Sequence, residues 1–179
     1  MKAKVQLMDE TAVERALTRL SYEIIEKCAD PATLVLVGIK TRGIPMAKVL
    51  ASKILAHGGP QIPVCELDIT FYRDDLTHVN DDPTVTGAQF GVDITGREVI
   101  LVDDVLYTGR TIRAAIEAIF DLGRPAKIGL AVLIDRGHRE LPIKPDYVGK
   151  NVPTSQKEVV KVCFAQTDGV TSVTLYEKE

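Results

Sequence analysis

The fold is decided by one stretch of the sequence, Val99-Ile100-Leu101-Val102-Asp103-Asp104-Val105-Leu106-Tyr107-Thr108-Gly109-Arg110-Thr111. Its first four residues are apolar β-formers and predict a buried parallel strand, with two aspartates at the C-terminal end of that strand. A Thr-Gly-Arg-Thr turn then opens into a helical pattern over residues 112–122. Ligands bind at the carboxyl ends of strands in an open α/β sheet, so the stretch predicts both the fold class and the place of the site.

The turn after this strand has the chemistry of a phosphate cradle. A helix N-terminus offers unpaired N–H groups and a partial positive charge, Gly109 lets the backbone approach a ligand closely, and Thr108 and Thr111 add hydroxyl donors. The carboxylates of Asp103 and Asp104, beside a phosphate, typically bind sugar hydroxyls or hold Mg²⁺. The stretch therefore predicts a phosphorylated sugar with a metal ion as the ligand. The alternative is a strand that ends in two solvated acids before an ordinary capped helix.

A second strand-loop-helix turn carries cationic and hydroxyl side chains. An apolar segment ends in Gly38-Ile39-Lys40-Thr41-Arg42-Gly43, and helical spacing resumes over residues 44–55. The two glycines resemble those of a P-loop, but Ile44-Pro45 stands where that motif has Lys-Ser or Lys-Thr. This difference excludes a nucleoside triphosphatase of the Walker type. The loop suits a second phosphate group, although a plain connection between a strand and a helix would also explain it.

The rest of the chain completes one domain over residues 1–179. Asp9 is placed to cap a helix that runs to about Cys28, and apolar patterns predict further strands at 64–71, 128–134, 159–164 and 173–176. Residues 73–90 hold two acid pairs and little apolar periodicity, which predicts a flexible lid; a disordered segment is the alternative. No repeat or linker divides the chain.

Composition limits the classes of protein that the chain can be. Its three cysteines are widely spaced and indicate neither a zinc site nor a disulfide framework. There is no basic-apolar leader and no apolar run of about 18 residues, so we expect a soluble cytoplasmic protein with no membrane partner. The net charge is −3, but residues 66–104 carry −8 and the remainder +5. An anionic partner is therefore compatible with the charge distribution.

These motifs resemble those of a known family. Residues 99–111 resemble the phosphoribosyl-pyrophosphate motif of type I phosphoribosyltransferases, residues 38–43 their pyrophosphate loop, and residues 73–90 their flexible loop. More closely, four stretches, 67–76, 104–111, 135–142 and 149–155, are similar to the family of pyrimidine operon attenuation regulators and uracil phosphoribosyltransferases. The similarity spans almost the whole chain.

The resemblance implies a central, mostly parallel, twisted sheet flanked by helices, with a small hood from segments within about 135–179. It implies the conversion of uracil and phosphoribosyl pyrophosphate to UMP and pyrophosphate, with Mg²⁺ as cofactor. Carried over by position, Arg42, Asp103 and Asp104 would be catalytic, and the two aspartates would hold Mg²⁺ largely through substrate and water. The implied substrate-binding set is Thr41, Arg42, Asp103, Asp104, Leu106, Tyr107, Thr108, Gly109, Arg110, Thr111, Arg136 and Val160.

One position favours a pyrimidine substrate. Purine-specific members of the superfamily place an acid three residues after the acid pair, where it can assist proton removal from the base. This chain has Tyr107 there. We therefore name no general base, and we expect catalysis to depend on positioning and on stabilising the departing pyrophosphate.

The resemblance also implies UMP-dependent binding of pyrimidine-operon messenger RNA by a homodimer or higher homo-oligomer, which promotes transcription attenuation. The residues implied to contact RNA are Thr18, Arg19, Tyr22, Lys27, Arg139, Lys144 and Lys150. The family pattern has histidine at Tyr22 and arginine at Lys27 and Lys144, and lysine lacks the bidentate fork of arginine. A uracil phosphoribosyltransferase without a regulatory role is the alternative, and the helical part of this set would then be an ordinary solvated face.

Overall fold

A twisted six-stranded sheet forms the centre of the molecule in the computed structural model, which describes residues 1–70 and 88–178. The strands lie in the order β4 (Ala88–Gln89), β3 (Val64–Leu67), β2 (Leu34–Ile39), β5 (Glu98–Leu106), β6 (Lys127–Asp135) and β7 (Tyr147–Asn151). All pairs are parallel except β3 with β4. This confirms the predicted α/β fold with a mostly parallel sheet. Of the predicted lid, residues 73–87 lie outside the described residues.

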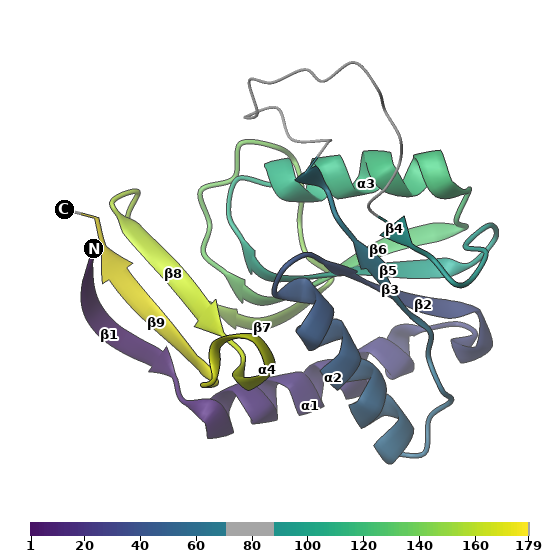
Figure 1. Cartoon of the computed structure of the whole chain (residues 1–179), viewed down its shortest axis with the longest axis horizontal. Helices are drawn as coiled ribbons and strands as arrows, with labels where there is room; N and C mark the ends of the chain where they lie inside the picture. The colour runs from purple at the N-terminus through teal and green to yellow at the C-terminus, as the bar shows by residue number, and fades with distance from the viewer. Residues whose placement is uncertain (71–87, 179) are drawn as a thin grey trace.

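Helices cover both faces of this sheet. On one face, α1 (Glu10–Lys27) and α2 (Gly43–Ala56) share a buried apolar cluster with alternate residues of the central strands. On the other face, α3 (Arg110–Leu122) packs through a second apolar cluster (Figure 1). The central strands are apolar on both faces because both faces are buried, as in parallel sheets generally. This two-sided packing fixes the carboxyl ends of β2 and β5 along one edge.

The first helix illustrates how local sequence sets these elements. The side chain of Asp9 accepts a hydrogen bond from the Ala12 N–H at 2.8 Å, so α1 has an N-cap, as predicted. Val13, Leu17 and Leu20 are buried on its inner face. The helix ends before Cys28, and the short 3-10 turn η1 (Pro31–Thr33) leads into β2.

A separate three-stranded antiparallel sheet stands beside the main sheet. It has the order β1 (Lys2–Met8), β9 (Ser172–Glu177), β8 (Glu158–Cys163), and the short helix α4 (Ala165–Asp168) connects β8 to β9. The sequence predicts β8 and β9 but gives no signal for β1, whose residues are mostly exposed. The small sheet therefore joins the two ends of the chain, whereas β7, within the segment expected to supply the hood, extends the main sheet.

Two strand ends differ from the sequence prediction in ways that matter for the site. β3 ends at Leu67 rather than near residue 71, and β5 continues past the acid pair to Leu106. β5 continues because its pairing with β6 extends to Leu106 opposite Asp135.

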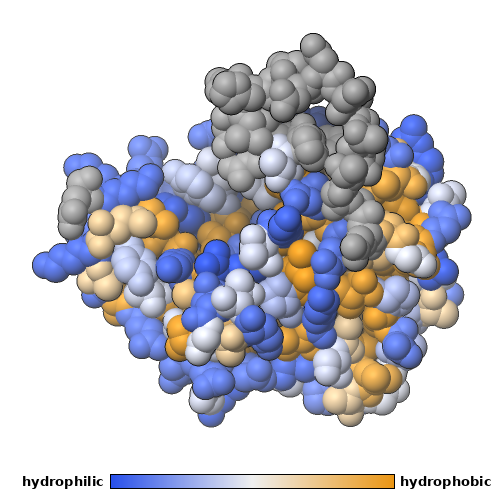
Figure 2. Space-filling view, viewed as in Figure 1, coloured by the Kyte–Doolittle hydropathy of each residue, from blue (hydrophilic) through white to orange (hydrophobic). Residues whose placement is uncertain are grey.

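Within the described ranges, no helix has the length and apolarity needed to cross a membrane. Figure 2 shows apolar patches interspersed with hydrophilic residues on the face that it draws.

Candidate active site

A cavity of about 380 Å³ opens at the carboxyl ends of β2, β3 and β5. It brings together Thr41, Asp103, Asp104 and Thr111 from the predicted site, and its lining is completed by Lys40, Asp68, Ile69, Thr70 and Val105. Asp68 and Thr70 were not predicted as site residues. Both residues lie towards the carboxyl end of a predicted strand, and the carboxyl ends of neighbouring parallel strands meet at one edge of a sheet. This placement could have identified them from the sequence.

Both members of the acid pair line this cavity, Asp103 buried and Asp104 partly buried. Asp103 is 8% exposed, and its Oδ1 accepts a hydrogen bond from the Asp104 N–H at 2.9 Å. Burial, together with the neighbouring charge of Asp104, raises the pKa of Asp103 well above its ordinary value, and burial also raises the pKa of Asp104. Two carboxylates held this way are stabilised by hydroxyl donors or a cation from a ligand.

The turn after β5 has the backbone geometry that a phosphate cradle needs. Gly109 has a φ of 94°, a left-handed conformation that favours glycine, and it is the N-cap residue of α3. The Arg110 N–H is 3.3 Å from the Thr108 hydroxyl. The positive end of the α3 dipole therefore lies directly after the acid pair, and a phosphate there would be favourably placed.

The second predicted loop lies against the first. The place that a Cβ would take on Gly43 is occupied by the backbone carbonyl of Val102, the residue before the acid pair. The loop contains a cis peptide bond between Lys40 and Thr41. Lys40 Nζ is 2.9 Å from Asp68 Oδ2, while Arg42 forms a two-pronged ion pair with Asp168. Only glycine at position 43 allows so close an approach.

Arg136 and Tyr107 are not among the residues that line this cavity; they directly follow β6 and β5 and pack against each other as a wall of two side chains. The guanidinium of Arg136, which is 5% exposed, lies 4.1 Å from the centroid of the Tyr107 ring. It donates hydrogen bonds to the Thr154 hydroxyl at 3.1 Å and to the carbonyls of Ser155 and Glu158 at 3.1 and 2.7 Å. Burial lowers the pKa of Arg136. These bonds fix Arg136 to the segment that leads into β8, the strand that contains Val160.

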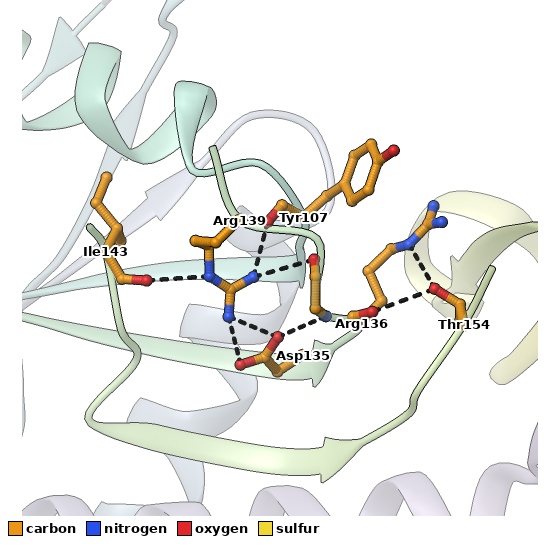
Figure 3. A network of polar contacts seen from close by, with 7 residues as sticks. Tyr107, Asp135, Arg136, Arg139, Ile143 and Thr154 are labelled. Atoms are coloured by element: carbon orange, nitrogen blue, oxygen red, sulfur yellow. Dashed lines mark hydrogen bonds and ion pairs between the residues drawn. The ribbon is translucent and has the colours of Figure 1, made fainter. Parts of the chain in front are cut away.

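Arg139 is at the centre of the network drawn in Figure 3. Its Nη2 donates to both carboxylate oxygens of Asp135 at 2.7 and 2.6 Å, its Nη1 to the Tyr107 carbonyl at 2.7 Å, and its Nε to the Ile143 carbonyl at 3.0 Å. The side chain is 22% exposed. The resemblance implies an RNA contact for Arg139, which stays a prediction, and in the structure its guanidinium donates within the chain. This geometry gives Arg139 a role in ordering the loop beside Tyr107.

The other residues predicted to contact RNA lie mainly on α1 and around β7. Tyr22 is 54% exposed, and its ring stacks on His57 with the centroids 4.4 Å apart. Arg19 donates to the carbonyls of Val148 and Gly149, which joins α1 to β7. Lys27 lies over the Tyr147 ring, and Lys150 Nζ is 3.2 Å from the Leu7 carbonyl. Thr18 is partly buried, and Lys144 is exposed. Their contact with RNA stays a prediction.

Solved structures of low identity share this fold. The hypoxanthine phosphoribosyltransferase of Trypanosoma cruzi superposes with a TM-score of 0.70 at 19% identity, covering 99% of this chain and 98% of that one. A hypoxanthine phosphoribosyltransferase from Staphylococcus aureus gives a TM-score of 0.70 at 19% identity, covering 97% and 92%. A model of the phosphoribosyl transferase domain matches residues 5–167. Fold, site and domain model together define a phosphoribosyltransferase of type I.

Curated relatives narrow the class. A protein of Acetivibrio thermocellus named bifunctional protein PyrR is 56% identical over 176 residues, which cover 98% of this chain and 96% of that protein. Another of the same name, from Clostridium perfringens, is 58% identical over 177 residues, covering 99% of each. The chain belongs to the PyrR family of bifunctional phosphoribosyltransferases.

Proposed function

We propose that this chain has the two activities of a bifunctional pyrimidine regulator. It transfers a phosphoribosyl group from phosphoribosyl pyrophosphate to uracil, which gives UMP and pyrophosphate, and it binds pyrimidine-operon messenger RNA in the presence of UMP to promote transcription attenuation. The observation that carries the transferase activity is the single cavity shared by the acid pair, the start of α3 and the loop after β2. A cavity with these parts can hold a sugar that carries a phosphate group at each end.

The parts of the cavity match the parts of the substrate. Asp103 and Asp104 bind the ribose 2′ and 3′ hydroxyls, and the turn over residues 106–111 binds the 5′-phosphate through backbone N–H groups and hydroxyls. Thr41 and Arg42 face the pyrophosphate. This assignment is supported by the close packing of Gly43 on β5, because that contact holds the second loop beside the acid pair.

The donors at the cavity suit a magnesium ion. Mg²⁺ prefers oxygen ligands and is commonly held by one or two carboxylates together with substrate phosphates and water. Asp103 and Asp104 are two such carboxylates, and their burial raises the pKa of both, so a divalent cation would stabilise their charged forms. The ion would neutralise charge that develops on pyrophosphate as it leaves.

The chain's own groups contribute chiefly by position. The acid pair orients the ribose, and the fixed guanidinium of Arg42 donates to the leaving pyrophosphate as the bond to the sugar breaks. The wall formed by Tyr107 and Arg136, with the backbone near Val160, accommodates uracil. Tyr107 has no carboxylate to accept a proton from a purine, which supports the choice of a pyrimidine.

The RNA-binding activity uses a different face. The exposed ring of Tyr22 could stack on an unpaired base, and the cations on α1 and around β7 could meet phosphates. A homodimer would present two such faces to one RNA. UMP connects the two activities, because it is the product of the transferase reaction and RNA binding depends on it.

The experiment for the transferase is a substrate comparison. Uracil, orotate and hypoxanthine are each supplied with phosphoribosyl pyrophosphate and Mg²⁺, and nucleotide formation is followed. We expect turnover of uracil at a kcat/KM at least tenfold above the other two bases. No turnover of uracil, or a preference for hypoxanthine, would reject the proposed substrate.

A further inference from the structure

The ion pair between Arg42 and Asp168 connects the two sheets of the molecule. Arg42 follows β2 of the main sheet, whereas Asp168 is the last residue of α4, between β8 and β9 of the small sheet. Arg42 Nη2 is 2.8 Å from Asp168 Oδ1, and its Nε is 3.3 Å from Oδ2. The side chains are 30% and 17% exposed, so solvent screens this pair less than a surface pair.

The carboxylate of Asp168 is itself held in place. Its Oδ2 also accepts a hydrogen bond from the Phe164 N–H at 3.0 Å, and its own N–H donates to the Phe164 carbonyl at 2.7 Å. Gly169 then ends α4 in a left-handed conformation, with a φ of 75°. Asp168 is therefore a fixed acceptor, and the hydrogen bond with Arg42 holds the pKa of this carboxyl below its ordinary value.

This pairing leaves a defined part of Arg42 for a ligand. A guanidinium has five N–H donors in a rigid fork. Asp168 takes the edge formed by Nε and Nη2, which leaves Nη1 and the second proton of Nη2 on the outer edge. Arg42 stands between Thr41, which lines the cavity, and Gly43, which packs on the Val102 carbonyl beside the acid pair. The outer edge is thus the one whose donors remain for a phosphate oxygen.

We propose that Asp168 is a positioning residue, which acts through Arg42 to aim the outer edge of the guanidinium at the pyrophosphate group of phosphoribosyl pyrophosphate. The inference rests on the proposed function, since it needs Arg42 to face that group. A side chain clamped on one edge loses little rotamer freedom when substrate binds, so less of the binding energy is lost to ordering. The opposite role is an inhibitory lock, in which Asp168 competes with pyrophosphate for the same donors.

The test is the variant Asp168→Asn, which keeps the shape of the side chain but removes its charge and one acceptor. Steady-state kinetics are measured with each substrate varied, and the Kd of inorganic pyrophosphate with Mg²⁺ is measured by calorimetry. We expect the KM for phosphoribosyl pyrophosphate and the Kd for pyrophosphate to rise about five- to twentyfold, and the KM for uracil to change less than twofold. Asp168→Glu, which retains the carboxylate, should recover part of the loss.

Two further variants separate positioning from general damage. Lys4→Gln removes another ion pair of the small sheet, with Glu158 at 2.6 Å, and should leave both KM values unchanged. Because Asp168 acts through Arg42, adding Asp168→Asn to Arg42→Gln should produce less than a twofold further effect.

The outcomes distinguish this inference from the proposed function. If the wild-type protein turns over uracil and Asp168→Asn is unchanged, the positioning role is rejected and the transferase stands. A lower KM for phosphoribosyl pyrophosphate in Asp168→Asn would also reject it, in favour of the inhibitory lock. Full additivity with Arg42→Gln would show that Asp168 does not act through Arg42. If wild type has no turnover of uracil, the proposed function fails, and pyrophosphate binding still tests the pair.

Discussion

Arg139 offers the sharpest test of how the loop beside Tyr107 is built. The substitution Arg139→Met keeps an unbranched apolar stem and removes every guanidinium donor. It leaves the Asp135 carboxylate without its ion pair. The carbonyls of Tyr107 and Ile143 lose the hydrogen bonds that Nη1 and Nε of Arg139 donate to them. The segment around Arg136, which packs on the Tyr107 ring, would then lose the hydrogen bonds that Arg139 makes within it (Figure 3).

The size of the effect follows from burial and geometry. Removing one partner of a buried ion pair costs about 3–5 kcal/mol. The side chains of Arg139 and Asp135 are 22% and 13% exposed, which lets water compensate part of that cost. We therefore expect a loss of about 2–3 kcal/mol in the free energy of unfolding. For a chain of this length the loss corresponds to a fall in Tm of about 4–12 °C.

The assay combines calorimetry with kinetics. Besides the fall in Tm, we expect the KM for uracil to rise about tenfold, because the base site is displaced, and the KM for phosphoribosyl pyrophosphate to change much less. Lys48→Gln is the control, since it breaks a more exposed pair with Glu66 and should cost at most about 1 kcal/mol. Wild-type Tm and uracil KM in Arg139→Met would show that these bonds do not order the loop, and weaker RNA binding in the same variant would support the predicted RNA contact of Arg139.

Three further predictions concern the acid pair, the close contact of the two loops and the RNA face. Because burial raises the pKa of Asp103, its charged form is less stable in the folded state, and this cost grows as the pH rises above about 4. Asp103→Asn should therefore raise Tm without ligand more at pH 7 than at pH 4, while turnover is lost; an equal change at both pH values would contradict this. Gly43→Ala should cost about 1–3 kcal/mol and lower kcat/KM, whereas Gly91→Ala, where a Cβ meets nothing within 4 Å, should be neutral in chemical denaturation. Lys150→Ala should weaken RNA binding and flatten its salt dependence while sparing turnover; an unchanged salt slope in a filter-binding titration would remove Lys150 from the interface.

The parts of the fold that the sequence predicted are those with strong periodicity. β2, β5 and β6 are continuous apolar runs, and α1 has both a cap and an apolar stripe, so each could be located within a few residues. β1 gave no such signal because most of its side chains are exposed, and its strand conformation depends on pairing with β9. β7 was missed because it is short and contains Gly149, which packs on the Leu133 backbone.

The site was predictable where one segment supplies several of its groups. The acid pair and the turn at Gly109 are adjacent in sequence, and so are Thr41 and Arg42. Contacts between distant segments were not predictable in this way. The pairing of Arg42 with Asp168 spans 126 positions. The inward orientation of Arg139 depends on the turn that brings the Tyr107 carbonyl to its guanidinium, although Asp135, four residues before it, was a visible partner.

We propose that one cradle for a pyrimidine nucleotide serves both catalysis and regulation. The most direct test of this proposal is the affinity of the wild-type protein for pyrimidine-operon leader RNA, titrated with and without UMP at several salt concentrations. We expect binding that is at least tenfold tighter with UMP, that falls steeply with salt, and that is not seen with an unrelated RNA. Equal, weak binding to both RNAs, whether or not UMP is present, would contradict the proposal and leave a uracil phosphoribosyltransferase without a regulatory role.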